Sequence, residues 1–377
     1  MNFIKPLLLL SNNIFLILLG LFGIGLIIGF HELGHFLFGK LFKIKTPAFA
    51  VGFGPKLYQR KIGETNFSIG AIPLGGYVES DKESFESKPY WQKMIVLAGG
   101  ISFNLLFAYF AFCILFMLGL PKTEFLYPIN TVPIIQKVAQ DPVITQLGIQ
   151  AGDKIIAINN ESIENKPLLF LKKLKDTKEK LEKEKTVKTA KITLDIERDG
   201  KTTKIEPPFE ALLNAFNKKQ IEFKFAEPQR RPFFESIKKG IRLTNVYIIN
   251  TLLIFKYMFV KRDTSALGGP ILIISKTAEG ASKGIKIFLL LLAIISVSLA
   301  VINLIPLPIL DGGQALLYTI EAIIRRKLPE KTKEVIMIAS WIFMLILFVL
   351  ISTRDVWRVA KQHFGNSSSE KQTTTKK

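Results

Sequence analysis

Two histidines and a glutamate stand close together near the N-terminus, in the sequence His31-Glu32-Leu33-Gly34-His35. Residues i and i+4 lie on the same face of a helix, so both imidazoles can reach one metal ion at ~2.0–2.1 Å. The glutamate beside the first histidine can then contact a water on that ion. This spacing predicts a hydrolytic zinc site, and the alternative is a pair of structural histidines satisfied by hydrogen bonds.

Such a site needs a third protein ligand, because catalytic zinc usually keeps three protein ligands and one water. His363 lies in a polar C-terminal segment, where we expect it to be solvated. Asp311 is the better candidate, although an Asp-Gly pair also commonly forms a turn or ends a helix. Cys113 is the single cysteine, which excludes a disulfide framework and any multi-cysteine metal site.

The composition is that of a membrane protein. Of 377 residues, 49% are hydrophobic, the mean hydropathy is +0.30, and the apolar residues are clustered in long runs. A membrane-crossing helix needs about 20 mostly apolar residues. Four segments meet or approach this requirement: Ile14–Phe30, which continues in a helical pattern to about Gly39, Met94–Leu120, Ile287–Leu310 and Val335–Ser352.

The first apolar run leads directly into the histidine cluster. Ionisable side chains at membrane depth are costly and are usually kept for function. A cleaved signal peptide is the alternative explanation of the run, but no small-residue cleavage site follows it and the apolar pattern continues past the charged cluster. We therefore expect a membrane helix that carries a metal site.

Positive charges in the short loops predict the orientation of these helices. Nine lysines and arginines lie within residues 39–93 and five more within residues 311–334, so both loops are expected on the cytoplasmic side. The long region from residue 121 to about residue 284 can lie outside as an ordinary domain.

The number of crossings decides whether Asp311 can join the two histidines. With four crossings, Asp311 ends the third helix on the same side of the membrane as His31 and His35. We interpret Leu243–Val260 as a helix on the membrane surface, since a fifth crossing would move Asp311 to the opposite side. Prolines 306 and 308 break the third helix, which is tolerated in a membrane only where the backbone lines an enclosed or wet cavity.

HELGH and NLIPLPILDGG, on two separate apolar segments, closely resemble the site-2 protease family of intramembrane zinc metalloproteases. The bacterial branch of RseP-type proteases, which regulate envelope-stress sigma factors, is the nearer match. Similar residues at 51–57, 72–78 and 267–270 extend the resemblance over most of residues 14–353. Two positions depart from the family pattern: Ala98-Gly99-Gly100 replaces the usual Ala-Gly-Pro, although Asn104 is retained, and Gln314 replaces a frequent histidine.

The resemblance implies a role for each matching residue. Zn²⁺ would be held by His31, His35 and Asp311, with Glu32 as general base and acid. Asn303 would bind the substrate carbonyl or oxyanion, with an interhelical polar contact as the alternative. The segment Phe67, Ser68, Ile69, Gly70, Ala71 and Ile72 would pair with an unwound substrate strand, with an ordinary cytoplasmic hairpin as the alternative.

A further similarity lies between the second and third apolar segments. Residues 148–159 are similar to the PDZ signature, and they are followed by an amphipathic segment at 168–181 and a hairpin around Asp199-Gly200. We expect a PDZ-like domain at 121–210 that binds a peptide or acts only as a spacer. Residues 211–284 would form a linker and the surface helix, and residues 354–377 a polar, disordered tail.

These observations predict a polytopic α-helical membrane protein with about four transmembrane helices, a membrane-associated β-hairpin region and one inserted α+β PDZ-like domain. Its membrane halves would be 1–120 and 285–353. We expect an intramembrane zinc endopeptidase of the bacterial inner membrane that cuts single-pass proteins, such as an anti-sigma factor, or remnant signal peptides. The domain would be periplasmic, and the partners would include lipid but no nucleic acid. The alternatives are an inactive PDZ scaffold and a metal transporter.

Overall fold

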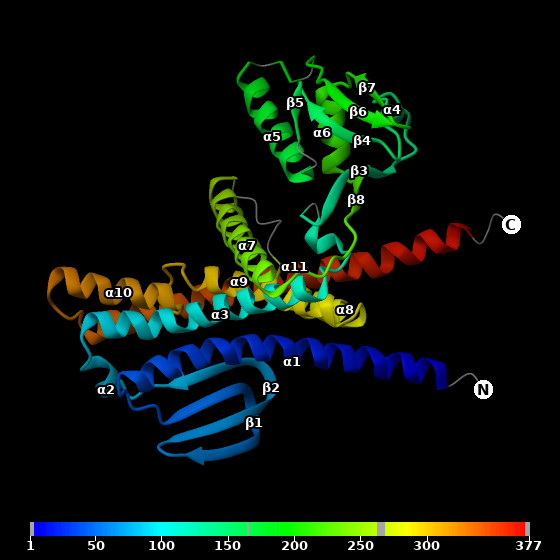
Figure 1. Cartoon of the computed structure of the whole chain (residues 1–377). Coiled ribbons are helices and arrows are strands. Elements are labelled where there is room, and N and C mark those ends of the chain that lie inside the picture. The colour runs from blue at the N-terminus through cyan, green and yellow to red at the C-terminus, as the bar shows by residue number, and fades with distance from the viewer. Residues whose placement is uncertain are drawn as a thin grey trace. The chain divides into compact units, whose positions relative to one another are not determined.

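Figure 1 shows the chain as a computed structural model that describes residues 4–127, 129–163, 166–184, 186–187, 189–261 and 268–373. Leu267, which opens one of the segments that match the family, lies outside the described residues. The chain divides into two compact units. One consists of Met1–Leu118 with Arg231–Lys377, and the other of Gly119–Arg230.

Four helices of the first unit are long and apolar enough to cross a membrane. They are α1 (Ile4–Leu41), α3 (Tyr90–Leu118), α9 (Ile285–Ile302) and α11 (Glu330–Thr373), with candidate spans over residues 14–41, 90–118, 285–302 and 330–356. The prediction of four crossing helices is therefore confirmed by length and composition, within the residues described. A short helix, α2 (Lys82–Glu86), precedes α3.

The helices α1 and α3 approach each other closely at the HELGH sequence. A Cβ atom added to Gly34 of α1 would lie 2.2 Å from the backbone oxygen of Gly99 in α3. Because any other residue would bring a Cβ atom into collision with Gly99, only glycine at position 34 lets the two backbones come this close. The small residues of the sequence thus bring the histidine helix against α3.

The third apolar run does not form one helix up to Asp311. Helix α9 ends at Ile302, residues 303–310 form turns, and α10 (Asp311–Ile324) begins at Asp311. Proline lacks a backbone N–H, so prolines 306 and 308 end the helical pattern. The backbone N–H of Gly312 donates to the carbonyl of Asn303 over 2.7 Å, which brings the ends of the loop together.

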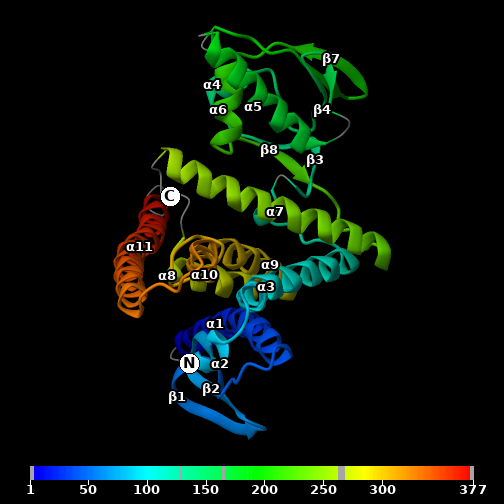
Figure 2. The same ribbon diagram turned by 90° about the vertical axis from the view of Figure 1, so that its left-hand side faces the viewer.

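The predicted surface helix is part of α7 (Phe233–Lys261), which is not one of the candidate spans. Helix α7 packs on α3 (Figure 2): the Tyr247 and Phe112 rings stack with centroids 5.4 Å apart, and the Tyr109 hydroxyl donates to Asn245 over 2.7 Å. Its position on a membrane surface stays a prediction. Helix α8 (Pro270–Ser282) follows it and packs against α1 and α9.

The predicted hairpin is present as β1 (Ala48–Ile62) and β2 (Thr65–Glu79), joined by the Gly63-Glu64 turn. The sheet packs beneath α1 (Figure 1), where the Phe36 ring lies 5.5 Å from the rings of Phe49 and Phe67. Each strand pairs twice: residues 48–51 pair with 66–69 on one side and with 76–79 on the other, and residues 58–62 also pair with 65–69.

This register corrects part of the predicted substrate-pairing strand. Phe67, Ser68 and Ile69 pair on both sides within the sheet, so their backbone groups are already used. A substrate strand can add only where one side of a strand is open. Gly70 and Ile72 each pair with one residue of β1, as do residues 76–79, which form the outer segment of β2.

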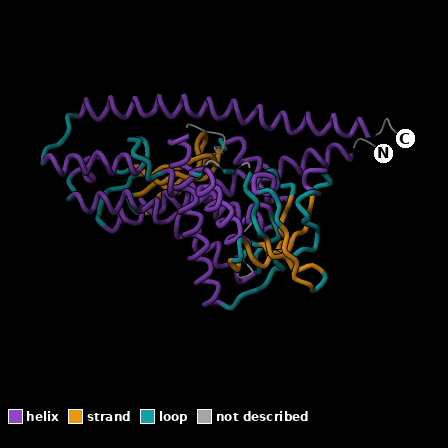
Figure 3. The backbone as a smooth tube through the Cα atoms, turned by 90° about the horizontal axis from the view of Figure 1, so that it is seen from above, coloured by secondary structure: helices purple, strands orange, loops and turns teal. Residues whose placement is uncertain are grey.

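The predicted disordered tail is helical through most of its length. Helix α11 continues without a break to Thr373, and Figure 3 shows it as one coil that leads to the C-terminus. The sequence contains no proline after Pro329, so nothing removes a backbone donor from the helix.

The second unit is an α+β domain with a sheet in the order β7-β6-β4-β3-β8, and β5 pairs with β4. Its elements are η1 (Glu124–Leu126), β3 (Thr131–Val138), α4 (Pro142–Thr145), β4 (Lys154–Ile158), β5 (Glu161–Ser162), α5 (Pro167–Lys183), β6 (Leu194–Arg198), β7 (Lys201–Ile205), α6 (Phe209–Asn217) and β8 (Ile221–Phe225). The hairpin at Asp199-Gly200 joins β6 and β7, as predicted. Both turn residues have positive φ, which fits a tight hairpin turn.

This unit extends beyond residue 210, where the sequence had placed its end. Strand β8 pairs with β3, and α6 buries Phe209 and Leu212 in the same core as Phe170 and Phe223. Residues 211–230 therefore belong to the domain rather than to a linker, because its core is incomplete without them.

Candidate metal centre

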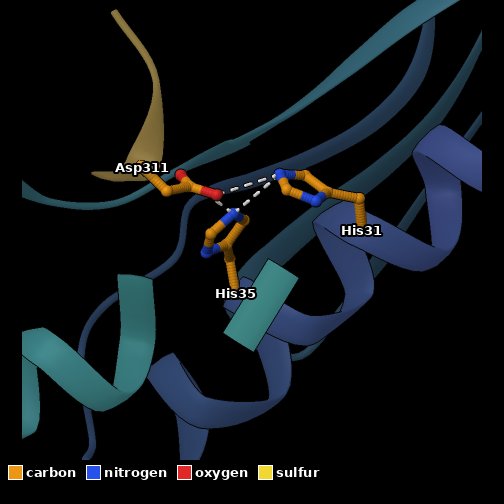
Figure 4. A group of neighbouring side chains, drawn as sticks. All are labelled: His31, His35 and Asp311. Carbon is orange, nitrogen blue, oxygen red and sulfur yellow. Dashed lines mark hydrogen bonds and ion pairs between the residues drawn. The ribbon is translucent and has the colours of Figure 1, made fainter. Parts of the chain in front are cut away.

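His31, His35 and Asp311 lie together in the first unit (Figure 4). The Nε2 atoms of His31 and His35 are 3.1 Å apart, and they lie 3.3 and 3.4 Å from the two carboxylate oxygens of Asp311. The three side chains are each at most 14% exposed. The histidines come from successive turns of α1, and the aspartate comes from the first residue of α10.

Helix α3 orients both imidazole rings through contacts with their Nδ1 atoms. The Nδ1 atom of His35 lies 2.8 Å from the backbone oxygen of Val96, and the Nδ1 atom of His31 lies 3.1 Å from the side-chain amide of Asn104. A carbonyl oxygen can only accept, so His35 carries a proton on Nδ1, and a neutral ring then turns the lone pair of Nε2 toward Asp311. Partners of this kind commonly fix the tautomer of metal-ligating histidines.

Gly100 leaves the space that the two rings occupy. A Cβ atom at this position would lie 2.4 Å from Nε2 of His35 and 2.5 Å from Cε1 of His31. In the sequence, Gly100 stands out only as a departure from the Ala-Gly-Pro pattern. Its contact with both rings could not be found without the packing of α1 on α3.

The donor set fits a zinc ion. Oδ2 of Asp311 is buried and accepts no hydrogen bond from the residues described. A carboxylate oxygen and two imidazole nitrogens that face one another within 4.8 Å are stabilised by a shared cation. Two histidines and one carboxylate are the protein ligands of a common type of catalytic zinc site, which keeps a fourth position open.

Glu32 lies beside this cluster and against β2. Its carboxylate accepts a hydrogen bond from the backbone N–H of Val78. A Cβ atom added to Gly76 would lie 3.1 Å from Cγ of Glu32. The carboxylate is thus held between the metal-ligand cluster and the outer segment of β2.

A cavity of about 900 Å³ joins these groups. It is lined by His31, Glu32, His35 and Asp311, by Asn303 at the end of α9, and by Gly76, Tyr77 and Val78 of β2. Asn303 is 8% exposed, and its predicted contact with a substrate carbonyl stays a prediction. None of residues 67–72 lines the cavity, so the hairpin meets the site through a different segment from the one predicted.

The same cavity continues to a polar cluster that the sequence analysis did not identify. Glu86 of α2 pairs with Lys93 of α3 over 2.8 Å and accepts a hydrogen bond from the Tyr318 hydroxyl over 2.8 Å. Burial raises the pKa of Glu86, but hydrogen bonds from Lys93 and Tyr318 outweigh it, so the pKa lies below its usual value. In the sequence, the only indication of this polar cluster is the concentration of charged residues next to the apolar segments.

Known proteins show the family to which this arrangement belongs. Residues 19–347 match the family described as Peptidase family M50. The chain belongs to peptidase family M50, the site-2 protease family. It is therefore a zinc metalloprotease of the membrane, as its ligand cluster and candidate spans indicate.

Bacterial relatives match along nearly their whole length. A protein of Clostridium acetobutylicum named as a zinc metalloprotease is 30% identical over 361 residues, which cover 91% of this chain and 98% of the relative. A protein of Campylobacter jejuni with the same kind of name is 28% identical over 372 residues, covering 89% and 92%. One from Clostridium perfringens is 28% identical over 339 residues, covering 86% and 94%.

Proposed function

We propose that this M50 peptidase is an intramembrane endopeptidase that hydrolyses peptide bonds in or near the transmembrane segment of single-pass membrane proteins. The observation that carries the proposal is the position of the ligands: His31 and His35 lie within the first candidate span, residues 14–41. A catalytic group at that position meets substrates that are themselves in the membrane. An anti-sigma factor or a remnant signal peptide has the required form.

Each residue of the centre has a chemical role in this proposal. His31, His35 and Asp311 hold zinc, which when bound polarises the substrate carbonyl and makes water more acidic. Glu32 takes a proton from the attacking water and later gives it to the leaving amine. Asn303 donates a hydrogen bond to the substrate oxygen on which negative charge develops.

A substrate helix must unwind before it can be cut, because its peptide groups are hydrogen-bonded within the helix. Residues 76–78 of β2 line the cavity next to Glu32 and pair with β1 only on one side. We assign the pairing of the unwound substrate to this segment, in place of residues 67–72. A substrate strand added here would have its scissile bond next to Glu32 and the metal ligands.

The orientation follows from the charges of the loops. Lysines and arginines are concentrated at residues 39–93 and 311–334, on the side where α1 and α9 end. By the positive-inside rule, we infer that the metal centre faces the cytoplasm of a bacterial inner membrane and that the unit 119–230 is extracytoplasmic.

We also propose that the unit 119–230 is a PDZ-like domain that selects or excludes substrates by their external segments. Its Gly152-Asp153 turn leads into β4, and Arg198 holds the buried Asp153 carboxylate through two hydrogen bonds of 2.7 Å. At the outer strand β8, the backbone N–H of Phe223 already donates to the Tyr127 hydroxyl. Any peptide that binds at β8 would have to displace this contact.

Reconstitution with a model single-pass substrate tests the proposed reaction. Glu32→Gln should abolish cleavage while zinc, measured by mass spectrometry, stays bound, whereas Asp311→Ala should lose both. Glu64→Gln, in the hairpin turn, is the matched control and should cleave normally. Cleavage by the Glu32→Gln protein at the wild-type rate would contradict the assigned role, and zinc bound without any cleavage by the wild type would favour the scaffold alternative.

A further inference from the structure

Helix α10 has two chemically different faces. The face toward α2 and α3 carries Tyr318 and Glu321, and Glu321 is only 9% exposed. The opposite face carries an apolar stripe of four exposed side chains, namely Leu316 (44%), Ile320 (36%), Ile323 (74%) and Ile324 (48%). Their spacing of i, i+4, i+7 and i+8 is that of one helical face. A stripe of this kind is typical of a helix that lies in a membrane interface.

Basic side chains follow the stripe directly. Arg325 ends α10 with φ 53°, and Arg326 and Lys327 continue into the loop before α11. Lys327 pairs with Glu86 over 3.6 Å, whereas Arg325 and Arg326 are exposed and form no ion pair with any residue in the described part of the chain. The two guanidinium groups therefore remain available for an anion.

A pocket of about 210 Å³ lies at these residues. It is lined by Tyr90, Lys93, Tyr318, Glu321, Ala322, Arg325, Arg326 and Lys327. Its one acidic group is already satisfied, because Glu321 pairs with Lys333 over 2.7 Å and accepts from the backbone N–H of Leu328 over 2.7 Å. The remaining charge of the pocket is positive.

The pocket lies next to the starts of two candidate membrane spans. Tyr90, which lines it, is the first residue of one span, and the other span begins at Glu330, three residues after Lys327. Lipid head groups are expected at the ends of membrane-crossing helices. The Tyr90 hydroxyl hydrogen-bonds with Thr319 of α10 over 3.0 Å, and Trp91 beside it is 54% exposed. Aromatic side chains are enriched at this level of membrane proteins.

We propose that this pocket binds the phosphate of an anionic phospholipid in the leaflet next to the metal centre. Arg325 and Arg326 would contact the phosphate, and the stripe of α10 would contact the acyl chains. Basic pockets between membrane helices recognise anionic head groups in this way. The bound lipid would fix the end of the helix whose first residue is Asp311, and so link the metal ligand to the surrounding leaflet.

The test uses the full chain in detergent and measures bound lipid by native mass spectrometry. Short-chain phosphatidylglycerol should bind in preference to phosphatidylcholine, and R325Q with R326Q should lower its affinity about fivefold for each arginine. The matched control is K201Q with K224Q, which removes the same charge from exposed positions of the unit 119–230 and should change nothing. Unaltered zinc content and circular dichroism verify that the variants fold.

Three results would overturn the proposal. The first is a pocket variant that keeps the wild-type preference for phosphatidylglycerol. The second is an equal loss in the control variant, which would show a general charge effect. The third is binding of glycerophosphoglycerol or inorganic phosphate as tightly as the lipid, which would show a site for free phosphate. Ile323→Asn separates these sources, since it should weaken the lipid and leave free phosphate unaffected.

Discussion

The side-chain amide of Asn104 lies 3.1 Å from Nδ1 of His31, although 73 positions separate the two residues. Asn104 is fully buried, and its Oδ1 atom has no partner among the described residues. A neutral His31 that offers Nε2 to a metal carries its proton on Nδ1, and an amide nitrogen cannot accept it. The opposite amide orientation, which fills the same space, puts Oδ1 in front of that proton, so we assign Asn104 as the acceptor.

Replacing Asn104 tests the direction of this hydrogen bond. Asn104→Asp keeps an acceptor and should retain zinc within a few-fold of the wild-type affinity. Asn104→Leu removes the acceptor and should weaken zinc binding by ~10–100-fold, the usual effect of losing such a partner. Competition with a chelator measures both affinities. Equal losses in the two variants would show that the amide nitrogen donates instead.

The contact between Gly34 and Gly99 should tolerate no side chain. Gly34→Ala would place a Cβ atom 2.2 Å from the Gly99 oxygen, so α1 must move away from α3. We expect a loss of about 1–3 kcal/mol in the free energy of unfolding and weaker zinc binding. Gly39→Ala is the control on the same helix, because its Cβ would meet only a methyl of Thr46 at 3.6 Å. Thermal unfolding of the two variants gives the comparison, and equal stability would contradict the close approach.

Glu86 predicts a dependence of stability on pH. Its folded pKa lies below the ordinary value of 4.5, because Lys93 and Tyr318 outweigh the effect of burial. A lowered pKa means that the stabilisation is present above about pH 4.5 and is lost as the pH falls through the folded pKa. Glu86→Gln should therefore be less stable at neutral pH and lose less stability on acidification. Glu83 is exposed on the same helix, so Glu83→Gln should show the wild-type dependence of stability on pH. If the stability of Glu86→Gln fell with pH in parallel with the wild type, the lowered pKa of Glu86 would be rejected.

Asp355 of α11 should stabilise the start of α8. Its carboxylate is completely buried, and Oδ2 accepts the backbone N–H of Leu272 over 3.0 Å. This bond satisfies one of the donors that the first turn of a helix leaves free. Asp355→Leu should cost about 0.5–2 kcal/mol, as the loss of a helix cap does. Asp355→Asn keeps a carbonyl acceptor and should cost less. The measurement is the melting temperature of each variant, and an Asp355→Asn protein that melts no higher than Asp355→Leu would contradict the assigned hydrogen bond.

Much of the metal centre could be predicted from local sequence alone. The i, i+4 spacing of His31 and His35 fixes both rings on one face of any helix that contains them. The uncharged lengths of the apolar runs determine four candidate spans in the same way. The parity of those spans was enough to select Asp311, although it could not show that α10 begins there.

Other features depend on contacts that no local pattern encodes. The sequence indicates a strand at residues 67–72, but which segment of the hairpin stays unpaired depends on residues 48–51 lying between two parts of β2. The roles of Asn104 and Gly100 likewise depend on how closely α1 packs against α3. Local sequence determined the chemistry and the elements, because these follow from short spacings. Tertiary structure decided the register of the hairpin and the contacts that orient the metal ligands, because these arise only when distant segments share one packed interior.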